Sequence, residues 1–236
     1  MSDLKLISSI AKQSLTIFTS AAEPDTCLWD RTERLVRNVK LICQMPEISK
    51  SGVQIDHLCL TVAAYFNYAG LACHLRTENK TARMAISKIS GNGELLVEYS
   101  AEVAAEKLDG LISEEQIANV SRIIIESCDH FTKKIEAMIL SDARNLDDMG
   151  AAGIFNQLRK HMAGGRGVSD VLASWQRKVD YQYWQARLRD GFRFNSVRIL
   201  AEQRLAAAEK FMNQLAVEHS ADDLQELSSS STFIDA

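Results

Sequence analysis

The chain has 236 residues, of which 46% are hydrophobic and 25% are charged, and its formal net charge at pH 7 is −4. These values fit one large or two small globular domains, and they exclude a strongly basic surface for nucleic acid or anionic lipid. Only two prolines and eleven glycines occur, so we expect long, uninterrupted elements.

Periodic apolar residues predict helices over residues 4–19 and 25–44 at the start of the chain. Residues 53–75 are apolar nearly all round, which predicts a third helix buried at the centre of the fold. The stretch 76–100 is the least regular part of the sequence, and Glu94–Tyr99 within it also fits an extended segment.

The second half of the chain is expected to be helical as well. Ser113–Gln116 has the pattern of a capping box, and Gly164–Gly167 predicts a flexible connection. The aromatic residues from Trp175 to Phe194 either close a helical core or, where exposed, form a protein interface. The expected helices lie at about 100–108, 113–128, 132–148, just before Gly164, from Ser169 through Trp184, and at 194–219.

The five cysteines form no CxxC pair, so we interpret them as reduced thiols rather than as a metal cluster. We identify no run of about 18 apolar residues and no signal-peptide pattern, which favours a cytoplasmic protein without a membrane partner. The fold class is therefore all-α. We expect an N-terminal helix within residues 1–22, a helical domain over 23–220 and a disordered tail over 221–236.

One segment carries a more specific signal. Residues Ile139–Ile154 read ILSDARNLDDMGAAGI. This segment resembles the stretch D-A-D-R-L-D-A-hydrophobic-G-A-hydrophobic-G-I of a branch of the HD-domain phosphohydrolases. The positions that match in register are Asp142, Ala143, Leu146, Asp147, Gly150, Ala151, Gly153 and Ile154.

Three other stretches occur in the same order as in that family. Arg31–Leu35 occupies the place of the family's H-x-x-R-V, and Ala63–Gly70 occupies that of A-A-hydrophobic-hydrophobic-H-D-hydrophobic-G. Phe194–Met212 resembles the closing helix of the branch. The resemblance spans roughly residues 25–220, matches poorly across 76–100, and implies an HD-domain-like helical bundle.

The resemblance also implies a metal site, which this sequence does not preserve. An HD site holds a divalent metal with two histidines and two aspartates, and the metal activates water against a phosphate ester. Carried over one at a time, these ligand positions fall on Arg31, Asn67, Tyr68 and Arg144. Even if the last position moved to Asp142, one carboxylate would not hold a catalytic metal. We therefore expect no metal and no other cofactor.

The arginines at and beside these positions allow two interpretations. In the first, Arg31 and Arg144 each form an ion pair with Asp30, Glu33, Asp142 or Asp147 and fill the vacated pocket. In the second, the guanidinium groups of Arg31, Arg34 and Arg144 replace the charge of the metal and bind a phosphorylated ligand without cleaving it. Asp142 and Asp147 lie five residues apart and are not an obvious acid–base pair.

We expect these two carboxylates to hold the helix geometry and to pair with Arg122, Arg31 or Arg144. Tyr68 either plugs the former metal pocket or donates a proton there.

Two functions remain open at this point. The first is a catalytically inactive HD-like protein, a regulatory, ligand-sensing or interaction module. It would bind a phosphorylated small molecule or a protein partner. Assembly of several copies of the chain into a homo-oligomer stays open. The second is a metal-dependent phosphohydrolase of the nucleotidase or phosphatase type, with non-standard ligands for a metal such as Mn, Ni or Fe. We favour the inactive protein, and we expect no nucleic-acid partner.

Overall fold

The computed structural model describes residues 2–18, 24–77 and 93–224, and nearly all of them lie in helices. The elements are α1 (Ser2–Leu15), β1 (Ile17–Phe18), β2 (Pro24–Asp25), α2 (Cys27–Cys43), α3 (Pro46–Ser49), α4 (His57–Phe66), α5 (Ala69–Thr77), α7 (Gly93–Leu108), α8 (Glu114–Glu126), α9 (Ile135–Asp147), α10 (Gly150–Ala163), α11 (Val168–Asp180), α12 (Tyr183–Asp190) and α13 (Asn195–Ser220). The two short strands pair antiparallel, with Ile17 opposite Asp25. The expected all-α fold class is confirmed.

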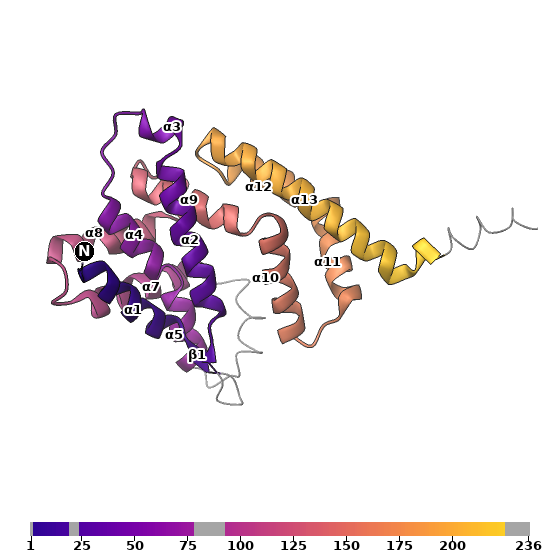
Figure 1. Ribbon diagram of the computed structural model, residues 1–236, viewed down its shortest axis with the longest axis horizontal. Helices are drawn as coiled ribbons and strands as arrows, with labels where there is room; N and C mark the ends of the chain where they lie inside the picture. Colours follow the sequence, from indigo (N-terminus) through magenta and orange to yellow (C-terminus); the bar gives the residue numbers. More distant parts are fainter. Residues whose placement is uncertain (1, 19–23, 78–92, 225–236) are drawn as a thin grey trace, which may run out of the picture.

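The helices form two groups that share one hydrophobic core. Figure 1 shows α1–α5 and α7–α9 gathered together, with α10–α13 along one side and the long helix α13 on the outside. Within the first group, α4 contacts α1, α2, α7, α8 and α9. Buried apolar residues run continuously from Ile7 in α1 to Met212 in α13. The N-terminal helix is therefore part of this core and not a separate appendage. Most of the expected tail, residues 225–236, lies outside the described part of the chain.

The apolar segment 53–75 is central, as predicted, but it forms two helices instead of one. The helix α4 begins only at His57, where the Asp56 side chain accepts a hydrogen bond from the Cys59 backbone N–H. It ends at Phe66, and α5 starts at Ala69, so Asn67 and Tyr68 form a break between them. This break falls where the family resemblance places the His-Asp pair.

Ser100 in α7 supports this break. Its hydroxyl donates to the Asn67 carbonyl at 3.1 Å and accepts from the Gly70 backbone N–H at 2.9 Å. The serine thereby replaces hydrogen bonds that a continuous helix would make for itself. Because α7 begins at Gly93, the extended alternative for Glu94–Tyr99 is wrong.

The stretch His57–Arg76 is long and apolar enough to cross a membrane by composition alone, which corrects our expectation that no such run occurs. In the fold, however, 72% of its most apolar window is buried inside the protein. Burial of this extent is typical of core helices, so the stretch is weak evidence for a membrane span.

The later helices follow the predicted pattern with one exception. Ser113 and Gln116 form the expected capping box at the start of α8, and the turn at Gly164 separates α10 from α11. The single helix expected from Ser169 through Trp184 is instead two helices. They are separated at Gln182, whose φ of 51° is incompatible with a continuous helix.

Most of the aromatic residues between Trp175 and Phe194 are buried in the core, which agrees with the interpretation that they close it. Trp175 and Trp184 are buried with their ring centroids 5.1 Å apart, whereas Tyr181 is 82% exposed.

Candidate functional site

The former metal-ligand positions come together from three elements. Arg31 lies in α2, Asn67 and Tyr68 form the α4–α5 break, and Arg144 lies in α9. The guanidinium carbon of Arg31 lies 4.4 Å from the centroid of the Tyr68 ring, which is a cation–π contact. Arg144 is close enough to lower the pKa of the Tyr68 hydroxyl. Arg31 and Tyr68 are thus in contact, and Arg144 lies near them.

Tyr68 fills the centre of this cluster. It is 7% exposed, and its hydroxyl has no hydrogen-bond partner among the described residues. Burial raises the pKa of this hydroxyl to about 12, although Arg31 lowers it. A buried ring with an unpartnered hydroxyl agrees with the plug, and proton donation by Tyr68 stays a prediction.

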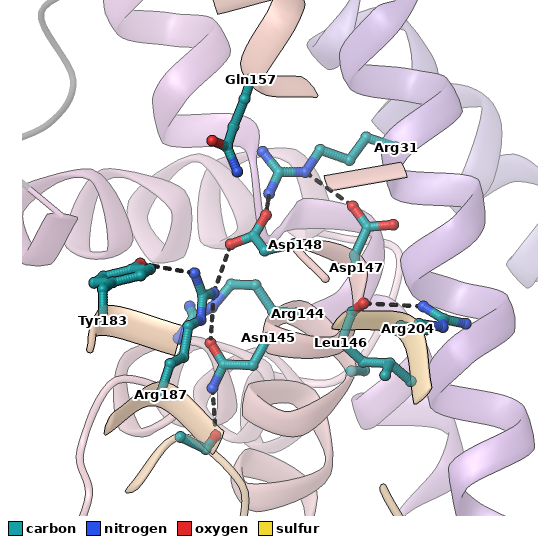
Figure 2. A network of polar contacts seen from close by, with 12 residues as sticks. Arg31, Arg144, Asn145, Leu146, Asp147, Asp148, Gln157, Tyr183, Arg187 and Arg204 are labelled. Carbon is teal, nitrogen blue, oxygen red and sulfur yellow. Dashed lines mark hydrogen bonds and ion pairs between the residues drawn. The ribbon is translucent and has the colours of Figure 1, made fainter. Parts of the chain in front are cut away.

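Arg31 forms ion pairs with two adjacent carboxylates (Figure 2). Its Nε donates to Asp147 at 3.1 Å, and its Nη2 donates to Asp148 at 2.5 Å. Arg34 also donates to Asp147, from Nε at 2.7 Å. Asp147 is only 1% exposed, so these two arginines neutralise a buried charge. Both arginines are thus paired with carboxylates. That they bind an anion stays a prediction.

Asp148 is the residue of this cluster that sequence reasoning missed. It stands where the family motif has alanine, and it accepts from Arg31 on one side and from Arg187 of α12, at 2.8 Å, on the other. Burial raises the pKa of this carboxyl, but the two guanidinium groups outweigh burial and hold it below its ordinary value. A signal was present in the sequence, because an acid replaces alanine in the same chain in which arginine replaces histidine at position 31.

Arg187 extends the network to neighbouring side chains. It donates to the Asn145 Oδ1 at 3.2 Å and to the Tyr183 hydroxyl at 3.0 Å. Figure 2 shows this chain of contacts running from Arg31 through Asp148 to Arg187. The chain turns sharply beside Asp148, where Gly150 has a φ of 75° that suits glycine.

Arg144 and Asp142 do not pair with each other. Within the described chain, Arg144 donates to the hydroxyl and the carbonyl oxygen of Ser127, at 3.3 and 3.1 Å. Asp142 accepts instead from the backbone N–H groups of Arg193 and Phe194, at 2.9 to 3.1 Å. The expected pairing of Asp142 with an arginine side chain is therefore wrong, because the turn before α13 supplies backbone donors to this buried carboxylate.

Of the other expected pairings, that of Asp147 with Arg31 is confirmed. Arg122 pairs with Glu126, four residues further along its own helix.

The residues at the former ligand positions do not fit a divalent metal. Arg31 and Arg144 are permanent cations, and Asn67 and Tyr68 offer only a carboxamide and a protonated phenol. Within residues 2–18, 24–77 and 93–224, no three His, Cys, Asp or Glu side chains gather closely enough to hold an ion.

A cavity of about 350 Å³ opens beside this cluster, between α2 and α5 on one side and α10–α12 on the other. Arg31 and Asp148 lie on its wall, which also contains apolar side chains such as Leu28 and Leu71. Cations from four helices converge on it: Arg31, Arg159, Lys160, Lys178 and Arg187. This convergence was not predicted, because helical periodicity does not reveal which helices face each other.

The two carboxylates that line the cavity are already engaged. Asp25 pairs with Arg159 at 2.7 Å, and Asp148 is shared by Arg31 and Arg187. Burial lowers the pKa of both Lys160 and Lys178, in the latter to about 8. The cavity wall carries five cationic side chains and two carboxylates, which suits an anionic ligand.

Comparisons with known proteins identify the fold. No protein-family model matches this sequence, and no curated protein does. Bacillus subtilis YpgQ in its selenomethionine form is similar in structure, with a TM-score of 0.60 and 20% sequence identity over 92% of this chain and 96% of YpgQ. The crystal structure of YpgQ in complex with ADP has a TM-score of 0.56 and 19% identity, over 91% and 96% of the two chains.

A predicted HD superfamily hydrolase from an uncultured Thermotogales bacterium is similar as well. Its TM-score is 0.54 and its identity 18%, over 91% of this chain and 92% of that one. At these identities the likeness concerns the fold, and it agrees with the resemblance of the sequence motifs. The chain therefore has the all-α fold of these structures, with arginine, asparagine and tyrosine at the positions where the sequence resemblance places the metal ligands.

Proposed function

We propose that this protein binds a phosphorylated small molecule in the cationic cavity without hydrolysing it, and that it acts as a ligand-sensing or regulatory module. The observation that carries the proposal is the set of five cations around a cavity whose two carboxylates are already paired. Converging like charges destabilise one another in a partly desolvated space, and a bound anion removes that penalty. A phosphate group adds acceptor oxygens that match guanidinium donors.

Binding without turnover is supported by the chemistry of the former ligand positions. Arg31 lies where the first histidine is expected, and its guanidinium is fixed by Asp147, Asp148 and the Tyr68 ring. Imidazole and carboxylate ligands are absent from these positions, so a ligand would meet fixed positive charge there. One protein of the same fold, YpgQ, has been crystallised with ADP, which makes ADP a sensible member of a test panel.

Thermal unfolding with inorganic phosphate, pyrophosphate and ADP tests the proposal. A ligand that binds only the folded protein raises its melting temperature by mass action, by about 2.7 kcal/mol at a hundred times its Kd. Replacing a cavity cation, in Lys160→Met, should weaken the shift. Arg31→Ala should abolish it, because this arginine joins the cavity to the former metal site. Lys210→Met is the matched control, since Lys210 is exposed on α13 and does not line the cavity.

The alternative, a metal-dependent phosphohydrolase, has a direct test in the same preparation. Metal content should be measured in the purified protein, and phosphatase and nucleotidase turnover should be assayed with Mn²⁺, Co²⁺ or Ni²⁺. Stoichiometric metal, or turnover that Asp142→Ala abolishes, would contradict the proposal. An unchanged melting temperature across the whole panel would contradict the binding site itself.

A further inference from the structure

The amine of Lys178 lies among aromatic rings and not in a surface ion pair. Its ammonium group lies 5.6 Å from the Tyr183 ring centroid and 5.2 Å from that of Trp184. It donates a hydrogen bond to the Gln157 Oε1 at 2.6 Å. No ion pair links it to a carboxylate in the described residues. The amine therefore faces the cavity between aromatic walls, with only a neutral acceptor as its partner.

The charges around Lys178 weaken its hold on a proton. Burial is the largest cause of its lowered pKa, and the cations Arg187 and Lys160 add to it, while Asp148 opposes them. With a pKa of about 8, roughly a tenth of the amine is unprotonated at pH 7, against roughly one part in two thousand for an ordinary lysine. A desolvated lysine beside other cations is the form in which this side chain acts as a nucleophile.

The cavity also provides what a ligand needs besides an amine. Arg187 and Lys160 lie beside Lys178, so an anionic group bound there meets positive charge. The indole N–H of Trp184 is buried without an acceptor in the described part of the chain. An unpaired buried donor is costly, and a polar ligand atom in the cavity would satisfy it.

We propose that Lys178 forms an imine with an aldehyde or ketone that carries an anionic group and binds in this cavity. This inference rests on the proposed function, because the same cations would bind the anionic group of the ligand. It adds a covalent step to that binding. The unprotonated Nζ of Lys178 attacks the carbonyl carbon, and a C–N bond forms. The carbonyl oxygen then leaves as water with the two protons of the amine nitrogen, so a C=N bond replaces C=O. The step needs no oxidant or reductant and is reversible.

Pyridoxal 5′-phosphate serves as the probe, because it joins an aldehyde to a phosphate. The full-length protein is incubated with less than one equivalent, the imine is trapped with borohydride, and the labelled lysine is identified by peptide mass mapping. We expect Lys178 to be labelled at least about tenfold faster than any exposed lysine, because its unprotonated fraction is on the order of a hundredfold larger.

Two variants separate charge from nucleophilicity. Lys178→Arg keeps the positive charge but cannot form an imine. It should therefore lose the label and keep the thermal shift given by pyridoxine 5′-phosphate, which carries the phosphate without an aldehyde. Lys210→Arg, a change at an exposed position on α13, should leave both readouts as they are in the original protein.

The possible results separate the two proposals. A label spread over exposed lysines, or a label that survives unchanged in Lys178→Arg, overturns the imine. A thermal shift with pyridoxine 5′-phosphate but no label at Lys178 also overturns the imine and supports the phosphate site. Equal labelling of Lys178 by pyridoxal and by pyridoxal 5′-phosphate supports the nucleophile and overturns the anionic half of the site.

Discussion

Asp142 shows how this chain uses an acid that the family resemblance associates with metal binding. The carboxylate is buried in α9, and both of its oxygens accept hydrogen bonds from the backbone N–H groups of Arg193 and Phe194. It thereby fixes the turn that starts α13. Burial raises the pKa of Asp142 to about 6, although these hydrogen bonds lower it. Its role here is to position a helix.

This raised pKa predicts a pH dependence of stability. Unfolded aspartate has a pKa near 3.9, so between about pH 4 and 6 the folded protein binds more protons at this site than the unfolded chain does. The contribution of Asp142 is therefore most favourable below this window, and it falls as pH rises, by up to roughly 3 kcal/mol in all. Asp142→Asn should flatten the fall.

Urea unfolding at several pH values between 4 and 7 measures this effect as the difference between the original protein and the variant. Asp109→Asn, in an exposed turn, is the control for the other titrating carboxylates. A pH profile of Asp142→Asn that runs parallel to that of the original protein would contradict a raised pKa at Asp142.

The polar cluster shows where prediction from the sequence stops. The family resemblance predicted that Arg31, Tyr68 and Arg144 lie together, because it assigns those positions to one metal. It did not predict that Asp148 is the second carboxylate bound by Arg31. It also did not predict that Arg187 of α12 binds Asp148 from the other side. These contacts join residues far apart in the chain, and their choice depends on how helices face each other, which local pattern does not encode.

The break between α4 and α5 depends on close contact with α7. At Gly70 an added Cβ would overlap with the Leu96 carbonyl oxygen and the Ser100 backbone nitrogen. The glycine therefore lets α7 approach near enough for Ser100 to satisfy the backbone groups of Asn67 and Gly70. Apolar periodicity predicted that this segment is central but not that it breaks, because the break is made by a partner helix.

Gly70→Ala should consequently destabilise the protein. Backbone atoms would have to move apart, and overfilling a tightly packed contact costs about 1–3 kcal/mol. The Tyr68 ring should shift with the break, which would loosen its contact with Arg31. Gly167→Ala is the matched control, since nothing lies within 4 Å of a Cβ added there and its φ is not positive. Equal midpoints of urea unfolding for the two variants would contradict a close α5–α7 contact.

Polar contacts link the two groups of helices across the whole molecule. Asp148 lies between α9 and α10 and joins Arg31 of α2 to Arg187 of α12. Glu47 accepts hydrogen bonds from the backbone N–H groups at the start of α13. In the HD fold as the resemblance describes it, a metal gathers ligands from three helices. In this chain, the ion pairs of Arg31 with Asp147 and Asp148 connect α2 to the end of α9.

This arrangement predicts that loss of one charge loosens one side of the protein before the other. Asp148→Asn leaves Arg31 and Arg187 without their shared carboxylate, although Arg31 keeps Asp147. Removing one partner of a fully buried pair costs about 3–5 kcal/mol, and the partial exposure of Asp148 and the contact that remains reduce this to about 2 kcal/mol. For a chain of this length the melting temperature should fall by about 4–8 °C.

Hydrogen exchange locates the change as well as detecting it. Amide protection in α12, which holds Arg187, should fall in Asp148→Asn, while protection in the central helix α4 stays as it is. Asp190→Asn is the control on the same helix, because Asp190 is exposed and pairs with its neighbour Arg189. If α12 and α4 lost protection together, or if neither changed, Asp148 would not be the contact that holds α12 against the rest of the fold. A loss confined to α12 would show that this carboxylate holds α12 against α2.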